Sequence, residues 1–314
     1  KQHPELVRRY APFQWMDPGS ATVRDHTMRV ISDGVKRYDI DGVHIDDYFY
    51  PYLERNPRTR RYIQFPDDKT YRGYRNRGGK LSRDDWRRSN IDKFVEQLYH
   101  TVNELKPWVK VGISPFGIWR PGIPATTTAG IDQHDELYAD VKKWLNNGWL
   151  DYLAPQLYWP ARPAEQAYAT LLRWWVEENL KYREVWPGLA LYKLPVVGPK
   201  HMSADDIVEE IGLTRQQSGA NGHLMFNARV LMNNVDRVAD RLAQVYAEPA
   251  LVPKMAWLDT VPPLQPSAAI AIDSLSTTVV RFQPGGVGFV THWVVQSRVG
   301  GVWPAGSLSG LGWA

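Results

Sequence analysis

The chain has 314 residues and a formal net charge of +4, with 43% hydrophobic and 23% charged residues, an ordinary globular balance that allows one or two domains. It contains no cysteine, which excludes disulfides, thiolate catalysis and zinc–cysteine sites. No apolar run approaches the roughly 18 residues of a membrane span, and no signal peptide is visible.

Short apolar runs alternate with longer amphipathic ones as far as about residue 245. Helical periodicity predicts helices over 23–38, 90–105, 136–148, 164–179, 203–219 and 234–246, the fifth of them capped by Ser203. The apolar runs between them predict strands near 39–46, 109–114, 150–157, 188–192 and 222–227, and the segment before Asp17 is a candidate for one more. This alternation of strands and helices predicts a parallel sheet.

The composition changes near residue 248. Residues 249–266 are rich in proline and are typical of a linker, and residues 267–314 alternate in the manner of strands separated by turns. We therefore expect an α/β domain over 1–248, a linker over 249–266 and a truncated β-sandwich over 267–314.

Successive side chains along a strand point to opposite faces of its sheet. In the first predicted strand Val43 and Ile45 share one face, and His44 and Asp46 share the other. The later strands repeat this division into an aliphatic face and a face that turns polar or aromatic at its C-terminal end. The pattern favours a (β/α)8 barrel of the TIM type, with its site at those ends, over a doubly wound sheet that needs two apolar faces. It predicts a shared site containing Asp46, Ser114, Gln156, Tyr158, Tyr192 and Asn227.

The adjacent carboxylates of Asp46 and Asp47 carry the clearest chemical signal, because like charges repel each other unless a function uses them. Glycoside cleavage uses one acid to protonate the leaving oxygen and a second carboxylate to attack or to activate water. Asp46 fits the second role. Asp47 is one candidate acid, although a regular strand would direct it away from the site; the alternative is an acid from loops that precede this sequence.

Other side chains near the acids are candidates to bind sugar. Rings expected to line subsites, with packing as an equally weighted alternative, are Tyr48, Tyr50, Trp119 and Trp159. His44 and Gln156 are candidates to hydrogen-bond substrate hydroxyls or Asp46. No cofactor is predicted.

Three other interpretations are weighed. Asp46 and Asp47 are also the ligands expected of a divalent cation site, although no second acidic cluster supports one. A barrel that binds glycan without cleaving it is a stronger alternative. Nucleic acid is disfavoured because the basic residues are not gathered on one predicted face, and the basic run over 55–80 is predicted to be a solvated loop.

Four motifs carry a resemblance to a known family. They are WMDPG (15–19), RYDIDGVHIDDYFYPY (37–52), VGISPFGIWRPG (111–122) and LYADVKKWLNNGWLDYLAPQLYW (137–159). With these motifs the chain resembles the glycosyl-hydrolase-like 10 family of bacterial envelope proteins. A weaker likeness to the chitinase pattern DGxDxDxE aligns Asp41, Gly42, His44, Asp46 and Tyr48, so that the proton donor of that pattern is absent here.

The resemblance implies a (β/α)8 barrel that lacks its first three strands, followed by part of a fibronectin-III-like β-sandwich. It implies cleavage of peptidoglycan glycan strands stripped of their stem peptides, in the periplasm or cell envelope, with cell-division proteins as partners. Tyr158 would hydrogen-bond an N-acetyl group. Because five or six strands do not close an eight-stranded barrel, the activity of this chain by itself is an open question.

Overall fold

The computed structural model describes residues 3–125, 127–161, 167–247, 250, 253–258, 261, 264–272 and 278–286. The chain divides into two compact units, Lys1–Arg241 and Leu242–Ala314. The first unit holds every predicted site residue.

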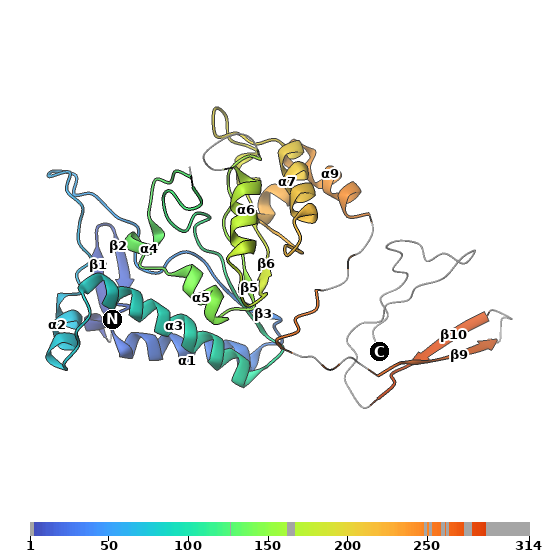
Figure 1. The fold of residues 1–314 in the computed structure, drawn as a ribbon, viewed down its shortest axis with the longest axis horizontal. Coiled ribbons are helices and arrows are strands. Elements are labelled where there is room, and N and C mark those ends of the chain that lie inside the picture. Colours follow the sequence, from blue (N-terminus) through green and yellow to red (C-terminus); the bar gives the residue numbers. More distant parts are fainter. Residues whose placement is uncertain are drawn as a thin grey trace. The chain divides into compact units, whose positions relative to one another are not determined.

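A parallel sheet lies at the centre of the first unit (Figure 1). Among the described residues it pairs, in chain order, β3 (Gly42–Ile45), β4 (Lys110–Ile113), β5 (Tyr152–Leu153) and β6 (Glu184–Val185). A further parallel pair, β7 (Gly188–Leu189) and β8 (Leu224–Met225), continues it through the bridges Gln156↔Gly188 and Val185↔Ala220. The predicted parallel sheet is confirmed, although its strands are shorter than predicted and β6 lies outside the predicted set.

The segment before Asp17 forms a separate antiparallel hairpin, with β1 (Val7–Tyr10) paired to β2 (Phe13–Met16). It does not join the parallel sheet. Within the described part of the chain β3 pairs with β4 alone, so its other edge is free and the strands do not close into a ring.

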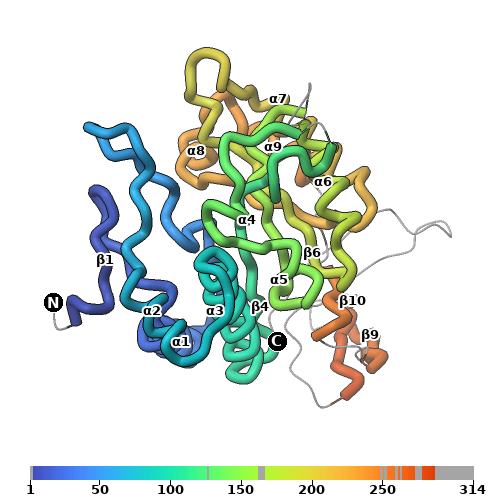
Figure 2. The backbone as a smooth tube through the Cα atoms, turned by 60° about the vertical axis from the view of Figure 1, so that its left-hand side comes forward, coloured from blue at the N-terminus to red at the C-terminus, as the bar shows by residue number. Residues whose placement is uncertain are grey.

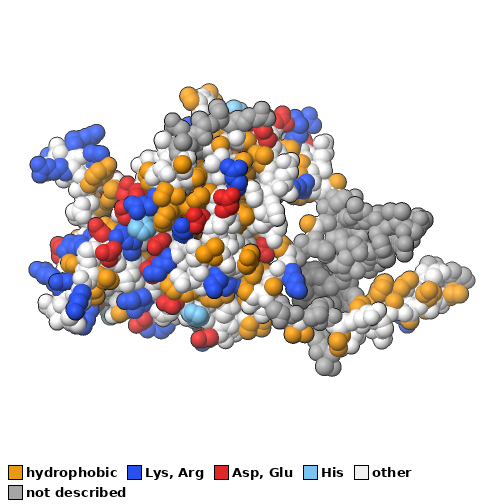
Figure 3. Space-filling model, in the orientation of Figure 1, with side chains coloured by type: hydrophobic (Ala, Val, Ile, Leu, Met, Phe, Trp, Pro, Cys, Tyr) orange, Lys and Arg blue, Asp and Glu red, His pale blue; other side chains and the backbone are white. Residues whose placement is uncertain are grey.

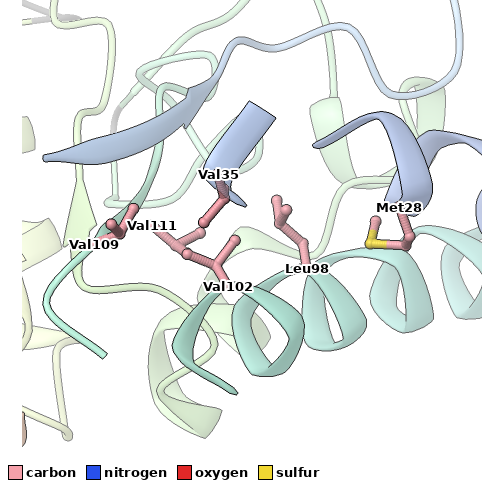
Figure 4. Packing of buried hydrophobic residues seen from close by; sticks show 6 residues of the cluster. All are labelled: Met28, Val35, Leu98, Val102, Val109 and Val111. Atoms are coloured by element: carbon pink, nitrogen blue, oxygen red, sulfur yellow. The ribbon is translucent and has the colours of Figure 1, made fainter. Parts of the chain in front are cut away.

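Two long helices, α1 (Ala21–Arg37) and α3 (Arg83–Leu105), lie side by side in the first unit (Figures 1 and 2). They bury an apolar cluster that Figure 4 shows, made of Met28, Val35, Leu98, Val102, Val109 and Val111. Val43 and Ile45 of β3 pack against this cluster, as strand alternation predicts. Each fully buried side chain of this kind stabilises the fold by about 1.5–3 kcal/mol.

The other helices of the described residues are shorter. They are η1 (Pro4–Leu6), α2 (Asp68–Asn76), α4 (Gln133–Glu136), α5 (Val141–Asn147), α6 (Tyr168–Glu177), η2 (Leu191–Lys193), α7 (Ala204–Gln216), α8 (Ala228–Met232), η3 (Val235–Arg237) and α9 (Val238–Val245). Ser203 is the N-cap of α7, as predicted, and forms a capping box with Asp206. Each helix in this part of the chain is too short or too polar to serve as a membrane span.

A buried ion pair fixes the long connection between β3 and α3. Arg87 is 2% exposed and Asp67 is fully buried, and Arg87 Nε and Nη2 donate to the two Asp67 oxygens at 2.7 and 2.8 Å. Arg87 Nη1 also donates to the Tyr138 hydroxyl at 2.7 Å. This bidentate geometry holds the connection that carries the aromatic run after Asp47.

The basic run over 55–80 is part loop and part helix. Figure 3 shows Lys and Arg side chains gathered over the loop near residues 55–62 and over α2. The prediction of a solvated loop is therefore correct for the first part and wrong for α2.

The second unit contains an antiparallel hairpin of β9 (Ser267–Ile272) and β10 (Thr278–Gln283). Ile270 and Ile272 are exposed. The rest of the predicted β-sandwich, beyond residue 286, lies outside the described residues, and a single hairpin does not support the fibronectin-III-like part of the prediction.

Candidate functional site

The acid pair follows directly after β3, which ends at Ile45. Asp46 is exposed, and its Oδ1 accepts a hydrogen bond from Gln156 Nε2 at 2.7 Å and from the Asp47 backbone N–H at 3.1 Å. Gln156 Nε2 also donates to the Ser114 carbonyl at 3.1 Å. Three separate segments therefore meet at the C-terminal edge of the sheet, where parallel α/β sheets place their sites.

Asp47 has a different environment from Asp46. It is 6% exposed, and its Oδ2 accepts a short hydrogen bond from the Tyr52 hydroxyl. Burial raises the pKa of Asp47, and the neighbouring charge of Asp46 adds to the rise, while hydrogen bonds from Tyr52 and Gln156 oppose it. Because β3 ends at Ile45, strand alternation no longer applies to Asp47, and it turns toward the site. Two carboxyl groups in such unlike environments suit an acid and a base.

A cavity of about 610 Å³ adjoins the acid pair through Gln156 and Tyr52. It is lined by Tyr52, Phe116, Gln156, Tyr158, Trp159, Pro160, Tyr192, Lys193, Val196, Pro199, Lys200 and His201. The structure thus brings four of the predicted residues together here: Gln156, Tyr158, Trp159 and Tyr192. A volume of this size, with rings and a few polar groups in its wall, is ordinary for a ligand site.

The aromatic rings that line this cavity pack against one another. Tyr158 contacts Tyr192 edge-on at 5.5 Å between centroids, and Trp159 contacts Phe116 in the same way at 5.5 Å. Burial raises the pKa of Tyr158, and the charge of Asp46 raises it further. The Tyr158 hydroxyl therefore stays neutral and can both donate and accept hydrogen bonds.

His44 belongs to a stacked layer below the acid pair. Its ring is stacked on Tyr152 at 5.8 Å, its Nδ1 lies 3.0 Å from the Tyr152 hydroxyl, and Tyr152 in turn stacks on Trp186 at 4.5 Å. Partial desolvation lowers the pKa of His44. A Cβ on Gly112 would lie 1.9 Å from the Tyr152 ring, so glycine is required where this ring crosses β4.

Two predicted sugar-binding rings pack elsewhere. Tyr50 is 1% exposed and packs edge-on against Tyr138 at 5.0 Å between centroids. Trp119 stacks on Trp174 of α6 at 6.0 Å, with Lys142 Nζ 5.3 Å from its ring. For these two rings the structure favours the packing alternative.

The remaining predicted residues lie near the site without lining the cavity. Tyr48 is 64% exposed and contacts Tyr52 at 6.2 Å between centroids. Ser114 is buried and offers its carbonyl to Gln156. Asn227 is the residue before α8, and its Oδ1 is buried without a partner among the described residues.

Sequence reasoning missed several residues of the cavity wall. Tyr52 stands within the motif over 37–52, and its aromatic character was a usable signal. Phe116, by contrast, shares the inward parity of Gly112 and Ser114, so strand alternation does predict its direction. The basic residues of the cavity wall follow β7: Lys193 ends η2, and Lys200 and His201 lie in the loop after it. This segment has no periodicity, so no pattern indicated that the three residues share one wall.

One cluster of the described residues places three metal-type ligands within 4.8 Å of one another: Asp132, His134 and Asp135. Arg120 already pairs with both carboxylates of this cluster, at 2.9 and 2.5 Å, and Arg88 pairs with Asp135 at 3.0 Å. These cations neutralise the acids that a metal would use. The cluster is distinct from Asp46 and Asp47.

The chain was compared with known proteins. A model of the family described as glycosyl hydrolase-like 10 matches residues 1–203. The glycosyl hydrolase YngK of Bacillus subtilis is 38% identical over 274 residues, covering 85% of this chain and 52% of YngK. The glycosyl hydrolase DigH of Escherichia coli K12 is 36% identical over 197 residues, covering 62% of this chain and 43% of DigH. The chain spans about half the length of these relatives.

Two solved structures are similar at low scores. The alpha-L-fucosidase isoenzyme 2 from Paenibacillus thiaminolyticus gives a TM-score of 0.45 at 12% identity, over 84% of this chain and 36% of that chain. Bee venom hyaluronidase, in complex with a hyaluronic acid tetramer, gives a TM-score of 0.34 at 12% identity, over 72% of this chain and 93% of that chain. Such scores carry no argument about activity.

The family model covers nearly two thirds of the sequence, and the motifs at 15–19, 37–52, 111–122 and 137–159 all lie inside the matched range. The chain therefore belongs to the glycosyl hydrolase-like 10 family.

Proposed function

We propose that this protein is a glycoside hydrolase that cleaves peptidoglycan glycan strands from which the stem peptides have been removed. The observation that carries the proposal is the pairing of Asp46 with Gln156 at 2.7 Å, beside the buried Asp47 and against an aromatic cavity of about 610 Å³. Family membership and relatives named glycosyl hydrolases support the class of reaction.

The two acids take different roles in this proposal. Asp47, whose pKa is raised by burial, is the general acid: its proton passes to the glycosidic oxygen as the bond from that oxygen to the anomeric carbon breaks. Asp46, exposed and oriented by Gln156, either attacks the anomeric carbon or takes a proton from the attacking water. Tyr52 and Gln156 are positioning residues for the pair.

An N-acetyl sugar fits the side chains of the cavity. Tyr158 and Tyr192 present hydroxyls to its amide group, and Trp159 presents a ring face for the sugar. In line with the resemblance, we place the protein in the periplasm or cell envelope and expect cell-division proteins as partners.

For the architecture, we propose that the consecutive parallel strands from β3 to β8 form an arc of a (β/α)8 barrel. Their chain-order pairing, with helices between successive strands except between β6 and β7, supports this arrangement. We propose domain limits of 1–248, 249–266 and 267–314, with a fibronectin-III-like fold for the last.

Digestion of amidase-treated peptidoglycan by the purified protein, read by mass spectrometry, tests the proposal. Hydrolysis gives products with reducing-end muramic acid, and these disappear in Asp46→Asn. Anhydro-muramic ends in place of reducing ends would refute hydrolysis and indicate a lyase-type reaction.

A glycan-binding protein without hydrolase activity is the second candidate. It is favoured by the alignment of His44 and Tyr48 with two acidic positions of the chitinase pattern. It is correct if the wild-type protein binds peptide-free strands and releases no product.

A further inference from the structure

One wall of the cavity carries positive charge, opposite in sign to the acid pair. Lys193, at the end of η2, is half-buried, and its Nζ donates a hydrogen bond to the Tyr158 carbonyl. Lys200 and His201 follow in the same loop and line the same cavity, and His201 Nδ1 donates to the Val196 carbonyl at 2.9 Å. This cationic wall, made of Lys193 and Lys200, lies beside Tyr158, with His201 next to Lys200.

The lysine charges in this wall are only weakly compensated within the described part of the chain. In the described part of the chain no carboxylate pairs with Lys193 or Lys200 within 4 Å. The acid behind Lys193 is Glu210 of α7, which is fully buried, and burial raises the pKa of Glu210 to about 9. Burial thus favours the protonated form of Glu210, which weakens its compensation of the ammonium.

The charged form of a half-buried ammonium is disfavoured by burial and by a neighbouring cation. Burial lowers the pKa of Lys193; the charge of Glu210 in its ionised form opposes this fall, and the charge of Lys200 adds to it. Lys193 has three N–H donors and uses one of them on the Tyr158 carbonyl. The remaining donors, together with the Lys200 ammonium, form a ready site for an anion that enters the cavity.

Resting on the proposed function, we propose that the cationic wall of Lys193 and Lys200 binds the free lactyl carboxylate of N-acetylmuramic acid and so makes the protein selective for peptide-free strands. In a strand that still carries stem peptides this carboxyl group is an amide and has no charge. Removal of the peptide creates the carboxylate. Lys193 contacts the Tyr158 carbonyl, whereas Asp46 is bound by Gln156, so the lysines and the acid pair are tied to different residues of the cavity wall.

Three matched oligosaccharides separate this inference from simple sugar binding. They are a peptide-free muramyl tetrasaccharide, the same tetrasaccharide with each lactyl carboxyl converted to a methylamide, and chitotetraose, which lacks the lactyl group. Their dissociation constants are measured by calorimetry in the Asp46→Asn background, so that no ligand is cleaved, at low salt and at about 0.5 M NaCl.

We expect the free acid to bind about tenfold or more tightly than the methylamide at low salt, and the ratio to shrink at high salt. Lys193→Gln combined with Lys200→Gln brings the ratio close to one, and chitotetraose reports any change in sugar affinity that is common to all three ligands and cancels in the ratio. Lys200→Gln alone, at an exposed position that poses no folding risk, gives an intermediate ratio. Lys181→Gln, an equal charge change before β6 at the opposite end of the sheet, leaves the ratio unchanged.

The results that would contradict this inference differ from those that would contradict the proposed function. Equal affinity for acid and methylamide, or a ratio that survives in the double variant, overturns the carboxylate site while the proposed hydrolase stands. If none of the three sugars binds, the proposed function fails and this inference fails with it.

Discussion

Replacing Glu210 with glutamine should change the pH dependence of folding stability. The side chain is fully buried, and neither carboxyl oxygen has a hydrogen-bond partner among the described residues. Burial and then the charge of Asp206 raise the pKa of Glu210 to about 9, against 4.5 for an ordinary glutamate. Between those two values the folded chain holds a proton that the unfolded chain has released, so the free energy of unfolding falls as the pH rises from about 4.5 to about 9.

The size of the effect follows from the gap between the two pKa values. A pH of 7 is 2.5 units above the ordinary glutamate pKa of 4.5, which applies to the unfolded chain. At about 1.36 kcal/mol per unit, this difference lowers the free energy of unfolding of the wild type by about 3 kcal/mol. At pH 5 the same arithmetic gives about 1 kcal/mol. Glutamine does not titrate, so the stability of Glu210→Gln relative to wild type should rise by about 2.7 kcal/mol between pH 5 and pH 7.

Urea unfolding of both proteins at the two pH values, followed by helical circular dichroism, measures this difference. The test is the change with pH in the stability difference between Glu210→Gln and wild type. The glutamine amide itself changes stability by an amount that does not depend on pH. Glu104→Gln, at an exposed position of α3, controls for the removal of one negative charge. A constant difference between Glu210→Gln and wild type would show that Glu210 is ionised when folded, and the argument for a weakly compensated Lys193 would fail.

Three further outcomes are expected. Arg87→Met removes the bidentate partner of the buried Asp67 and leaves it only the longer ion pair with Arg83, at 3.6 Å, so it should lower the free energy of unfolding by up to about 3–5 kcal/mol in urea titrations; a loss below about 1 kcal/mol would contradict the role given to this ion pair. Gly112→Ala should cost about 1–3 kcal/mol in the same assay by displacing Tyr152, and Tyr152→Leu in the same chain should restore most of it. Tyr52→Phe removes a donor that lowers the pKa of Asp47, so the alkaline limb of kcat/KM should move to higher pH; a limb that stays or moves down would refute Asp47 as the acid.

Strand alternation predicted the side-chain directions along β3 and, one residue beyond its end, that of Asp46. It placed Val43 and Ile45 against the helices and His44 and Asp46 on the other face, and the bond from Asp46 to Gln156 follows from that placement. The prediction succeeds because the side-chain period of a strand is fixed by its backbone.

The alternation of side chains along a strand does not reliably predict side-chain directions beyond the end of that strand. Asp47 turns inward because β3 stops at Ile45, and Trp119 lies in an irregular loop after β4, where packing against Trp174 decides its direction. Lys193 and Lys200 reach the cavity through a 3-10 turn and a loop, whose path depends on tertiary contacts that no sequence period reports.

Cleavage by Asp46→Asn, compared with wild type, tests the central claim most directly. Initial rates of reducing-end release from peptide-free glycan strands should fall by roughly 10²–10⁴-fold, with the affinity for those strands preserved. Asp41→Asn, the same chemical change just before β3 at the opposite end of the sheet, should keep the wild-type rate. Unreduced cleavage by Asp46→Asn would show that this carboxylate has no part in the reaction and would contradict the account.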